Sequence, residues 1–133
     1  MSDEILVIDA SALVDLVLGE ALGSAVRERV DGAALHAPAH LDAEVLSALG
    51  RMHRAGRLTS SLVARQLDAV AAAPIVRHLL PELLVRAWSH RSRLRLADAL
   101  YVQLAADLAV PLVTTDARLG RAVRAAEVIG GRQ

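Results

Sequence analysis

Short apolar runs recur along the chain, and longer segments with helical spacing separate them. The runs lie at residues 5–8, 34–38, 75–79 and 110–115, and residues 128–129 form a further short one. Each is bounded by proline, glycine or polar residues or gives way to a helical pattern, which is typical of strands. We therefore expect four strands and a fifth at an edge of the sheet.

The segments between these runs repeat apolar residues every three or four positions, which predicts amphipathic helices. They cover residues 11–18, 25–30, 40–55, 59–73, 81–88, 97–108 and 117–126, with Gly19 and Gly23 predicted to separate the first two. Because strands alternate with helices, we expect an α/β fold: a three-layer α/β/α sandwich with a central, mostly parallel sheet of four to five strands. No linker or internal repeat interrupts the pattern, so a single domain over residues 1–133 is expected.

The first apolar run ends abruptly in Asp9, with Ser11 two positions later. Four consecutive branched apolar residues are typical of a strand that is buried on both faces of a parallel sheet. Asp9 is then expected at the carboxyl end of a central strand, which is the edge where open α/β sheets bind ligands. Aspartate also favours the N-cap of a following helix, so capping is the alternative role at this position.

Three more acidic residues lie in comparable settings. Asp116 follows the last long apolar run, with the hydroxyl of Thr115 beside it, and this repeats the pattern at Asp9. Asp98 falls in the first turn of a predicted helix, and Glu44 interrupts an apolar helical pattern. Each acid alone has a simpler explanation, as a favourable charge at a helix N-terminus or as a solvated position. Together they predict a carboxylate cluster at one edge of the sheet.

Such a cluster has a definite chemistry. Carboxylates held close together repel one another unless a cation neutralises them. The chain has no Cys, and its five His residues show no paired metal-ligand spacing, so the donors are oxygens and suit Mg²⁺ or Mn²⁺. A cation in this position activates water and stabilises charge on phosphate oxygens, which is the chemistry of phosphodiester hydrolysis.

Composition disfavours several other classes of protein. All 15 basic residues are Arg, so activities that need a catalytic Lys are excluded, which argues against phosphotransfer enzymes and receiver domains. No Gly-x-Gly-x-x-Gly motif follows the first strand, which disfavours dinucleotide binding. The net charge of zero predicts no strong attraction to nucleic acid from bulk charge.

Hydropathy bears on location and partners. No uncharged run approaches the roughly 18 residues of a membrane span, and the acidic start does not resemble a signal peptide, so we expect a cytoplasmic protein with no membrane contact. Hydrophobic residues make up 54% of the chain although Phe is absent, which suggests that a partner covers part of an apolar surface. Trp88 is expected in the core or at such an interface.

Taken together, these motifs resemble the PIN-domain family, specifically the VapC-type toxin ribonucleases of type II toxin–antitoxin systems. The matching segments are residues 7–13, Glu44 within 38–49, residues 96–101 and residues 112–116, and they follow the family's order over nearly the whole chain. The resemblance implies a PIN-like sandwich and a Mg²⁺-dependent endoribonuclease that hydrolyses RNA by a metal-activated water. It also implies neutralisation by a cognate VapB-type antitoxin.

Carried over residue by residue, the resemblance implies that Asp9 and Asp98 are the principal metal ligands. Asp116 would complete the metal site, directly or through water, and Glu44 would orient or deprotonate the attacking water.

Further roles follow from the same resemblance. Ser11 and Thr115 would hold carboxylates or water by hydrogen bonds. Some members carry another acid directly after the fourth one, where this chain has Ala117 and Arg118. The resemblance therefore does not decide whether a second metal ion binds.

The RNA and the partners are less closely defined. Arg91, Arg93 and Arg95 precede Asp98 and are candidate RNA-phosphate contacts, with a solvated basic face as the alternative. The expected substrate is a transfer or ribosomal RNA, and a homodimer is expected. Two alternatives remain: a catalytically idle PIN-like binding module, and a PIN nuclease of RNA processing rather than a toxin.

Overall fold

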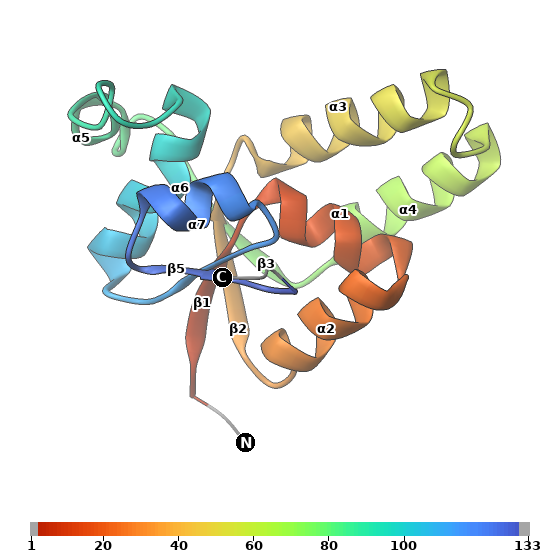
Figure 1. Ribbon diagram of the computed structural model, residues 1–133, viewed down its shortest axis with the longest axis horizontal. Coiled ribbons are helices and arrows are strands. Elements are labelled where there is room, and N and C mark those ends of the chain that lie inside the picture. Colours follow the sequence, from red (N-terminus) through yellow and green to blue (C-terminus); the bar gives the residue numbers. More distant parts are fainter. Residues whose placement is uncertain (1–2, 131–133) are drawn as a thin grey trace.

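The computed structural model describes residues 3–130 and shows one sheet with helices on both sides (Figure 1). The termini of the expected domain, residues 1 and 133, lie outside this range. The sheet has the order β3-β2-β1-β4-β5, and every neighbouring pair is parallel. The strands are β1 (Ile5–Ile8), β2 (Ala34–Pro38), β3 (Ile75–His78), β4 (Leu112–Thr114) and β5 (Ala126–Val128).

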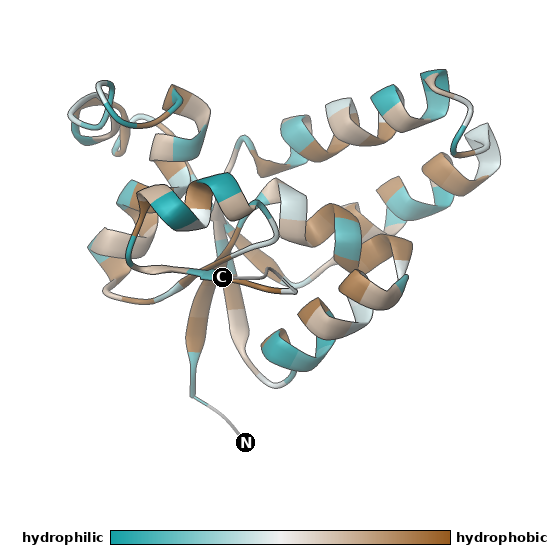
Figure 2. Ribbon diagram, in the orientation of Figure 1, coloured by the Kyte–Doolittle hydropathy of each residue, from teal (hydrophilic) through white to brown (hydrophobic). Residues whose placement is uncertain are grey.

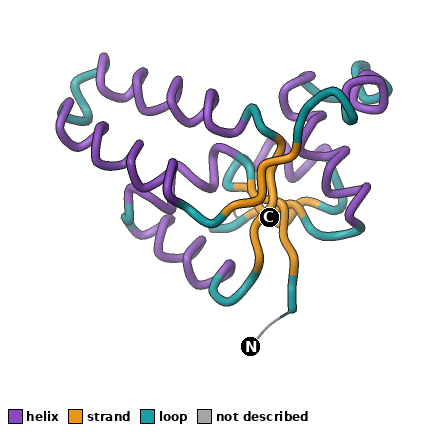
Figure 3. Tube along the Cα trace, turned by 180° about the vertical axis from the view of Figure 1, so that it is seen from behind, coloured by secondary structure: helices purple, strands orange, loops and turns teal. Residues whose placement is uncertain are grey.

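Helices cover both faces of this sheet. Figure 3 shows the first four helices on one side of the strands and α5 and α6 on the other, so the predicted three-layer α/β/α fold is confirmed. Over the described range, no helix combines the length and apolar character of a membrane-spanning segment. The helices are α1 (Ala10–Leu18), α2 (Ala21–Val30), α3 (Leu41–Arg54), α4 (Ser60–Ala72), α5 (Leu84–Trp88), α6 (Leu96–Leu108) and α7 (Ala117–Ala122).

The core is centred on β1 and β4. Val7 and Ile8 of β1 pair with Leu112 and Val113 of β4, and all four side chains are fully buried. Figure 2 shows the hydrophobic character of β1 and the alternation of polar and apolar residues along α4. Because β1 and β4 are adjacent and parallel, their carboxyl ends meet at the same edge, where the N–H of Asp9 donates to the carbonyl of Val113 at 3.2 Å.

The first two helices differ in part from the prediction. Gly19 ends α1 in a left-handed conformation with φ 72°, as predicted. Gly23, however, lies inside α2 rather than before it. A Cβ at Gly23 would lie 2.0 Å from the carbonyl oxygen of Asp15, so this glycine allows α1 and α2 to pack in close contact.

The end of the chain also differs from the prediction. The helix predicted over residues 117–126 stops at Ala122, and the edge strand predicted at 128–129 is residues 126–128. These residues pair with β4, with Thr114 opposite Val128. Pairing with the sheet therefore overrides the helical spacing of the last apolar residues.

Candidate active site

A cleft of about 310 Å³ lies at the carboxyl edge of β1 and β4. The N-terminal ends of α1, α3, α6 and α7 come together above this edge (Figure 1). The lining of the cleft includes all four acids predicted from the sequence, which are Asp9, Glu44, Asp98 and Asp116. Two of these acids follow adjacent strands and two come from helices, so the parallel sheet order is what brings them together.

Asp9 is the most buried of the four acids, with 5% of its surface exposed. Its Oδ1 accepts hydrogen bonds from the hydroxyl of Ser11 at 2.7 Å and from the N–H of Ala12 at 2.9 Å, and its Oδ2 accepts one from the hydroxyl of Thr114. Burial raises the pKa of Asp9 to about 6, although the three hydrogen bonds oppose this. Asp9 thus caps α1 and also faces the cleft, so the two roles considered for it coexist.

Asp116 caps α7 in a similar way. Its Oδ1 accepts from the N–H groups of Arg118 and Leu119, at 2.9 Å and 3.4 Å, and its Oδ2 accepts from the guanidinium of Arg118 at 3.1 Å. Burial favours a raised pKa for Asp116, but the hydrogen bonds from Arg118 and Leu119 outweigh it and hold the pKa below its usual value. Asp116 is therefore a stable anion with most of its lone pairs in use.

Asp98 lies in the first turn of α6, with 15% of its side chain exposed. Its Oδ2 is 3.4 Å from Nε of Arg95 and 3.6 Å from Nη2 of Arg118. Burial raises the pKa of Asp98 despite these two cations. Within residues 3–130 the carboxylate of Asp98 accepts no hydrogen bond, so its lone pairs are available to a cation.

Glu44 reaches the cleft from α3 and contacts a tyrosine that is buried in the core. The hydroxyl of Tyr101 donates to Oε1 of Glu44 at 2.6 Å, and Nε2 of His40 lies 3.5 Å from the same oxygen. Burial and this hydrogen bond raise the pKa of Tyr101, so its hydroxyl stays protonated as a donor. Tyr101 lies within the helix predicted over residues 97–108 and was not predicted as a site residue. Its position three residues after Asp98, on the same helical face, was the available signal.

The two predicted hydroxyl residues each donate to a carboxylate that lines the cleft. The hydroxyl of Ser11 donates to Asp9, and that of Thr115 donates to Asp15 at 2.7 Å. The fully buried Thr114 also donates to Asp9. Asp15 also lines the cleft, and neither it nor Thr114 was predicted as a site residue.

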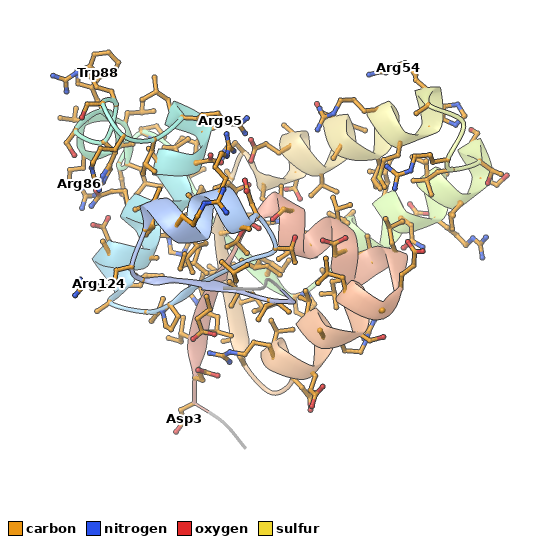
Figure 4. All side chains as sticks on the ribbon, viewed as in Figure 1. Asp3, Arg54, Arg86, Trp88, Arg95 and Arg124 are labelled. Carbon is orange, nitrogen blue, oxygen red and sulfur yellow. The ribbon has the colours of Figure 1, made fainter. Side chains whose placement is uncertain are left out.

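The three predicted RNA-binding arginines point in different directions. Arg95 lines the cleft, whereas the guanidinium of Arg91 lies 4.9 Å from the ring centre of Trp88 and Arg93 lies 3.5 Å from His90. Figure 4 shows Trp88 at an outer corner of the molecule, away from Arg95. Trp88 is 55% exposed, so it is not a core residue, and an interface remains the expectation for it.

The chemistry of the cluster fits a hard divalent cation. All of its donors are oxygens, one carboxylate is buried, and another has free lone pairs, which suits Mg²⁺ or Mn²⁺. However, no three acidic or histidine side chains of residues 3–130 already stand as a ligand group. Asp98 and Asp116 face Arg118 instead, so the ligand geometry has to form when the ion binds.

Comparison with known proteins agrees with this fold. The family model described as PIN domain matches residues 6–125. Ribonuclease VapC3 of Mycobacterium tuberculosis is 54% identical over 128 residues, which cover 96% of this chain and 93% of that protein. Ribonuclease VapC12 of the same species is 37% identical over 121 residues, covering 87% of this chain and 90% of that protein.

Two solved structures share the fold. PAE2754 from Pyrobaculum aerophilum has a TM-score of 0.67 at 24% identity and covers 93% of this chain and 82% of its own. VapC20 of Mycobacterium tuberculosis, described as a sarcin–ricin loop cleaving toxin, has a TM-score of 0.63 at 13% identity and covers 83% and 87%. The similarity to these two structures shows the fold alone. The family model and the sequence relatives show to which family the chain belongs. The chain belongs to the PIN-domain family and is a member of its VapC branch.

Proposed function

We propose that this protein, as a single PIN domain over residues 1–133, is a divalent-metal-dependent endoribonuclease and the toxin of a VapBC-type toxin–antitoxin pair. The observation that carries the proposal is that the four acids predicted from the sequence gather in one cleft at the carboxyl edge of β1 and β4. The 54% identity to a protein named Ribonuclease VapC3 supports the same activity.

The carboxylates have different roles in the proposed reaction. Asp9 and Asp98 would be the principal ligands of the ion, and Asp116 would complete its site, directly or through water; Mg²⁺ is the first candidate for the ion and Mn²⁺ the second. When bound, a divalent ion supplies positive charge to phosphate oxygens and lowers the pKa of water. Asp9 is suited to the role of ligand because its carboxylate is buried and already fixed by three hydrogen bonds.

Glu44 is the proton acceptor in this proposal. The hydroxyl of Tyr101 holds Oε1 of Glu44 and thereby fixes the direction of the carboxylate. Oε2 accepts no hydrogen bond from the described residues, so it is available to orient the attacking water and take its proton. The water oxygen bonds to phosphorus while its proton passes to Glu44, and one of the two ester P–O bonds breaks. The departing oxygen takes up a proton from solvent, so the products are one RNA fragment that ends in a phosphate and one that ends in a hydroxyl.

The substrate binds through its phosphates. Arg95 and Arg51 both line the cleft beside the carboxylates, where a guanidinium can pair with two phosphate oxygens at once. Arg91 and Arg93 lie on the segment before α6 and contact the RNA further from the cleaved bond in this scheme. With a net charge of zero, attraction to RNA depends on this local arrangement.

The proposed substrate is a loop of transfer or ribosomal RNA, reached in the cytoplasm. VapC20, which shares the fold, is described as cleaving the sarcin–ricin loop, and this supports a structured RNA loop as the target. A VapB-type antitoxin and a second copy of the chain are the proposed protein partners. The exposed apolar side chains of Leu84, Val85 and Trp88 on α5 offer a surface for such contacts.

The test is cleavage of total bacterial RNA by purified, antitoxin-free protein in Mg²⁺, in Mn²⁺ and in EDTA. Asp98→Asn is compared with Asp107→Asn, a matched control near the other end of α6 whose carboxylate pairs with Arg86. We expect discrete fragments with either metal, none with EDTA or Asp98→Asn, and normal cleavage by Asp107→Asn. Folded protein that cleaves no RNA in any metal would point to a binding module instead.

A further inference from the structure

A cation of the chain itself lies among the carboxylates. Arg118 is the second residue of α7, and its Nη2 is 3.1 Å from Oδ2 of Asp116 and 3.6 Å from Oδ2 of Asp98. One guanidinium therefore bridges two of the acids that are proposed to hold the metal. These acids come from different elements, α6 and the segment after β4, so Arg118 links two parts of the fold.

The bridge is anchored locally. The backbone N–H of Arg118 donates to Oδ1 of Asp116, while its guanidinium donates to Oδ2 of the same carboxylate. Both carboxylate oxygens of Asp116 therefore accept hydrogen bonds from Arg118, and the N–H of Leu119 is a third donor. Because the guanidinium of Arg118 also neutralises the charge of Asp116, this carboxylate has little capacity to bind a cation directly.

Asp98 and Asp9 have more capacity to bind a cation than Asp116. The carboxylate of Asp98 accepts no hydrogen bond within the described range, and Asp9 carries one donor on Oδ2 and two on Oδ1. Asp9 accepts as many hydrogen bonds as Asp116, but all three of its donors are neutral, so no guanidinium compensates its charge as Arg118 does at Asp116. A single divalent ion that keeps several of its waters needs only one or two carboxylates.

We infer that Arg118 takes the place of a second metal ion, so that the cluster binds one divalent cation, held mainly by Asp9 and Asp98. The inference rests on the proposed function, because it assumes that the cluster is a cation site. A guanidinium is always charged and its fork matches carboxylates, so it neutralises Asp116 and Asp98 as a metal ion does. A second divalent ion between these two acids would meet this fixed positive charge.

Arg118 has a simpler alternative role as an ordinary surface ion pair. Its side chain is 53% exposed, and exposed pairs add little to stability. Stability is therefore a poor measure of its function, whereas the number of bound ions separates the two roles. An ordinary surface pair leaves that number unchanged when it is removed.

The experiment counts Mn²⁺ ions per chain by equilibrium dialysis on the full-length, antitoxin-free protein. Arg118→Gln is compared with the wild type, with Arg118→Lys, which keeps the charge, and with Arg121→Gln, an exposed position on the same helix. Thermal unfolding verifies that each variant is folded. We expect one ion for the wild type, Arg118→Lys and Arg121→Gln, and two for Arg118→Gln.

The possible failures are distinguishable. Two ions on the wild type, or one ion on both the wild type and Arg118→Gln, would overturn the inference and leave the metal site of the proposed function intact. Two ions on Arg118→Lys would also overturn it, because the positive charge would then not be the cause. Absence of Mn²⁺ from all four proteins would overturn the proposed metal site together with the inference.

Discussion

The hydroxyl of Tyr101 donates a 2.6 Å hydrogen bond to Oε1 of Glu44. Tyr101 is 1% exposed and belongs to the core face of α6, whereas Glu44 reaches the cleft from α3. The packed core thus sets the direction of a carboxylate at the candidate active site. This relationship links the fold to the chemistry, because the side chain of Tyr101 cannot move without disturbing the core.

Replacement of Tyr101 by Phe removes this hydrogen bond and keeps the ring. A hydrogen bond to a charged group is worth about 1.5–3 kcal/mol, so we expect cleavage of RNA to slow roughly 10- to 100-fold. Mn²⁺ binding should stay at the wild-type level, since Tyr101 contacts Glu44 and none of the three proposed ligands. A cleavage rate equal to the wild type would show that Tyr101 does not position Glu44.

Glu44 can be compared with a neighbour on the same helix. Asp42 of α3 forms an ion pair with Arg77 and does not line the cleft. Removal of a general base costs roughly 100- to 10,000-fold in rate, so Glu44→Gln should reduce cleavage by that order while Mn²⁺ still binds. Asp42→Asn should cleave at the wild-type rate. Equal losses of cleavage rate in both variants would show that the substitutions disturb α3, and that the carboxylate of Glu44 has no special role.

The pKa of Asp9 predicts a pH-dependent stability in the metal-free protein. Burial raises this pKa from its usual 3.8 to about 6, so the folded protein binds the proton more tightly than the unfolded chain. The resulting stabilisation is fully present below about pH 4 and is lost as the pH rises through 6. The shift corresponds to a free energy on the order of 3 kcal/mol.

Asp9→Asn removes this titration. In urea unfolding with EDTA, the free energy of unfolding of the wild type should fall relative to Asp9→Asn between pH 4 and pH 7. Parallel pH curves for the two proteins would mean that Asp9 titrates alike in the folded and unfolded states.

Thr114 supplies one of the hydrogen bonds that oppose the rise in the pKa of Asp9. Thr114→Val keeps the shape of the side chain and removes the hydroxyl, so the pKa of Asp9 should rise further. Mn²⁺, measured by dialysis, should then bind more weakly than to the wild type near pH 6, with the difference shrinking near pH 8, where Asp9 is ionised in both proteins. A difference that is independent of pH would contradict this explanation.

The sequence predicted most of the fold because strands and helices differ in their apolar periodicity. The placement of Asp9 and Asp116 at one edge followed from two buried strands that each end in an acid, and β1 and β4 are indeed neighbours. The limits of β5 could not be obtained in this way, because they depend on pairing with β4.

The residues that support the acids were harder to predict. Thr115 was expected to hold a carboxylate or water and donates to Asp15, whereas the preceding Thr114, which was not predicted, donates to Asp9. Tyr101 sits within an apolar helical pattern, so its polar function depends on Glu44, 57 positions away in the chain. Apart from the position of Tyr101 three residues after Asp98, no local pattern in the sequence indicates these contacts across the fold.

In the proposed reaction, water that is directed by the carboxylate cluster and a divalent ion attacks the RNA phosphate. The chemistry of the new RNA ends made by wild-type protein in Mg²⁺ tests this step. Attack by water leaves no 2′,3′-cyclic phosphate, so we expect fragments without this group that are absent in EDTA and absent with Asp98→Asn. Fragments that end in a 2′,3′-cyclic phosphate and persist in EDTA would contradict this step.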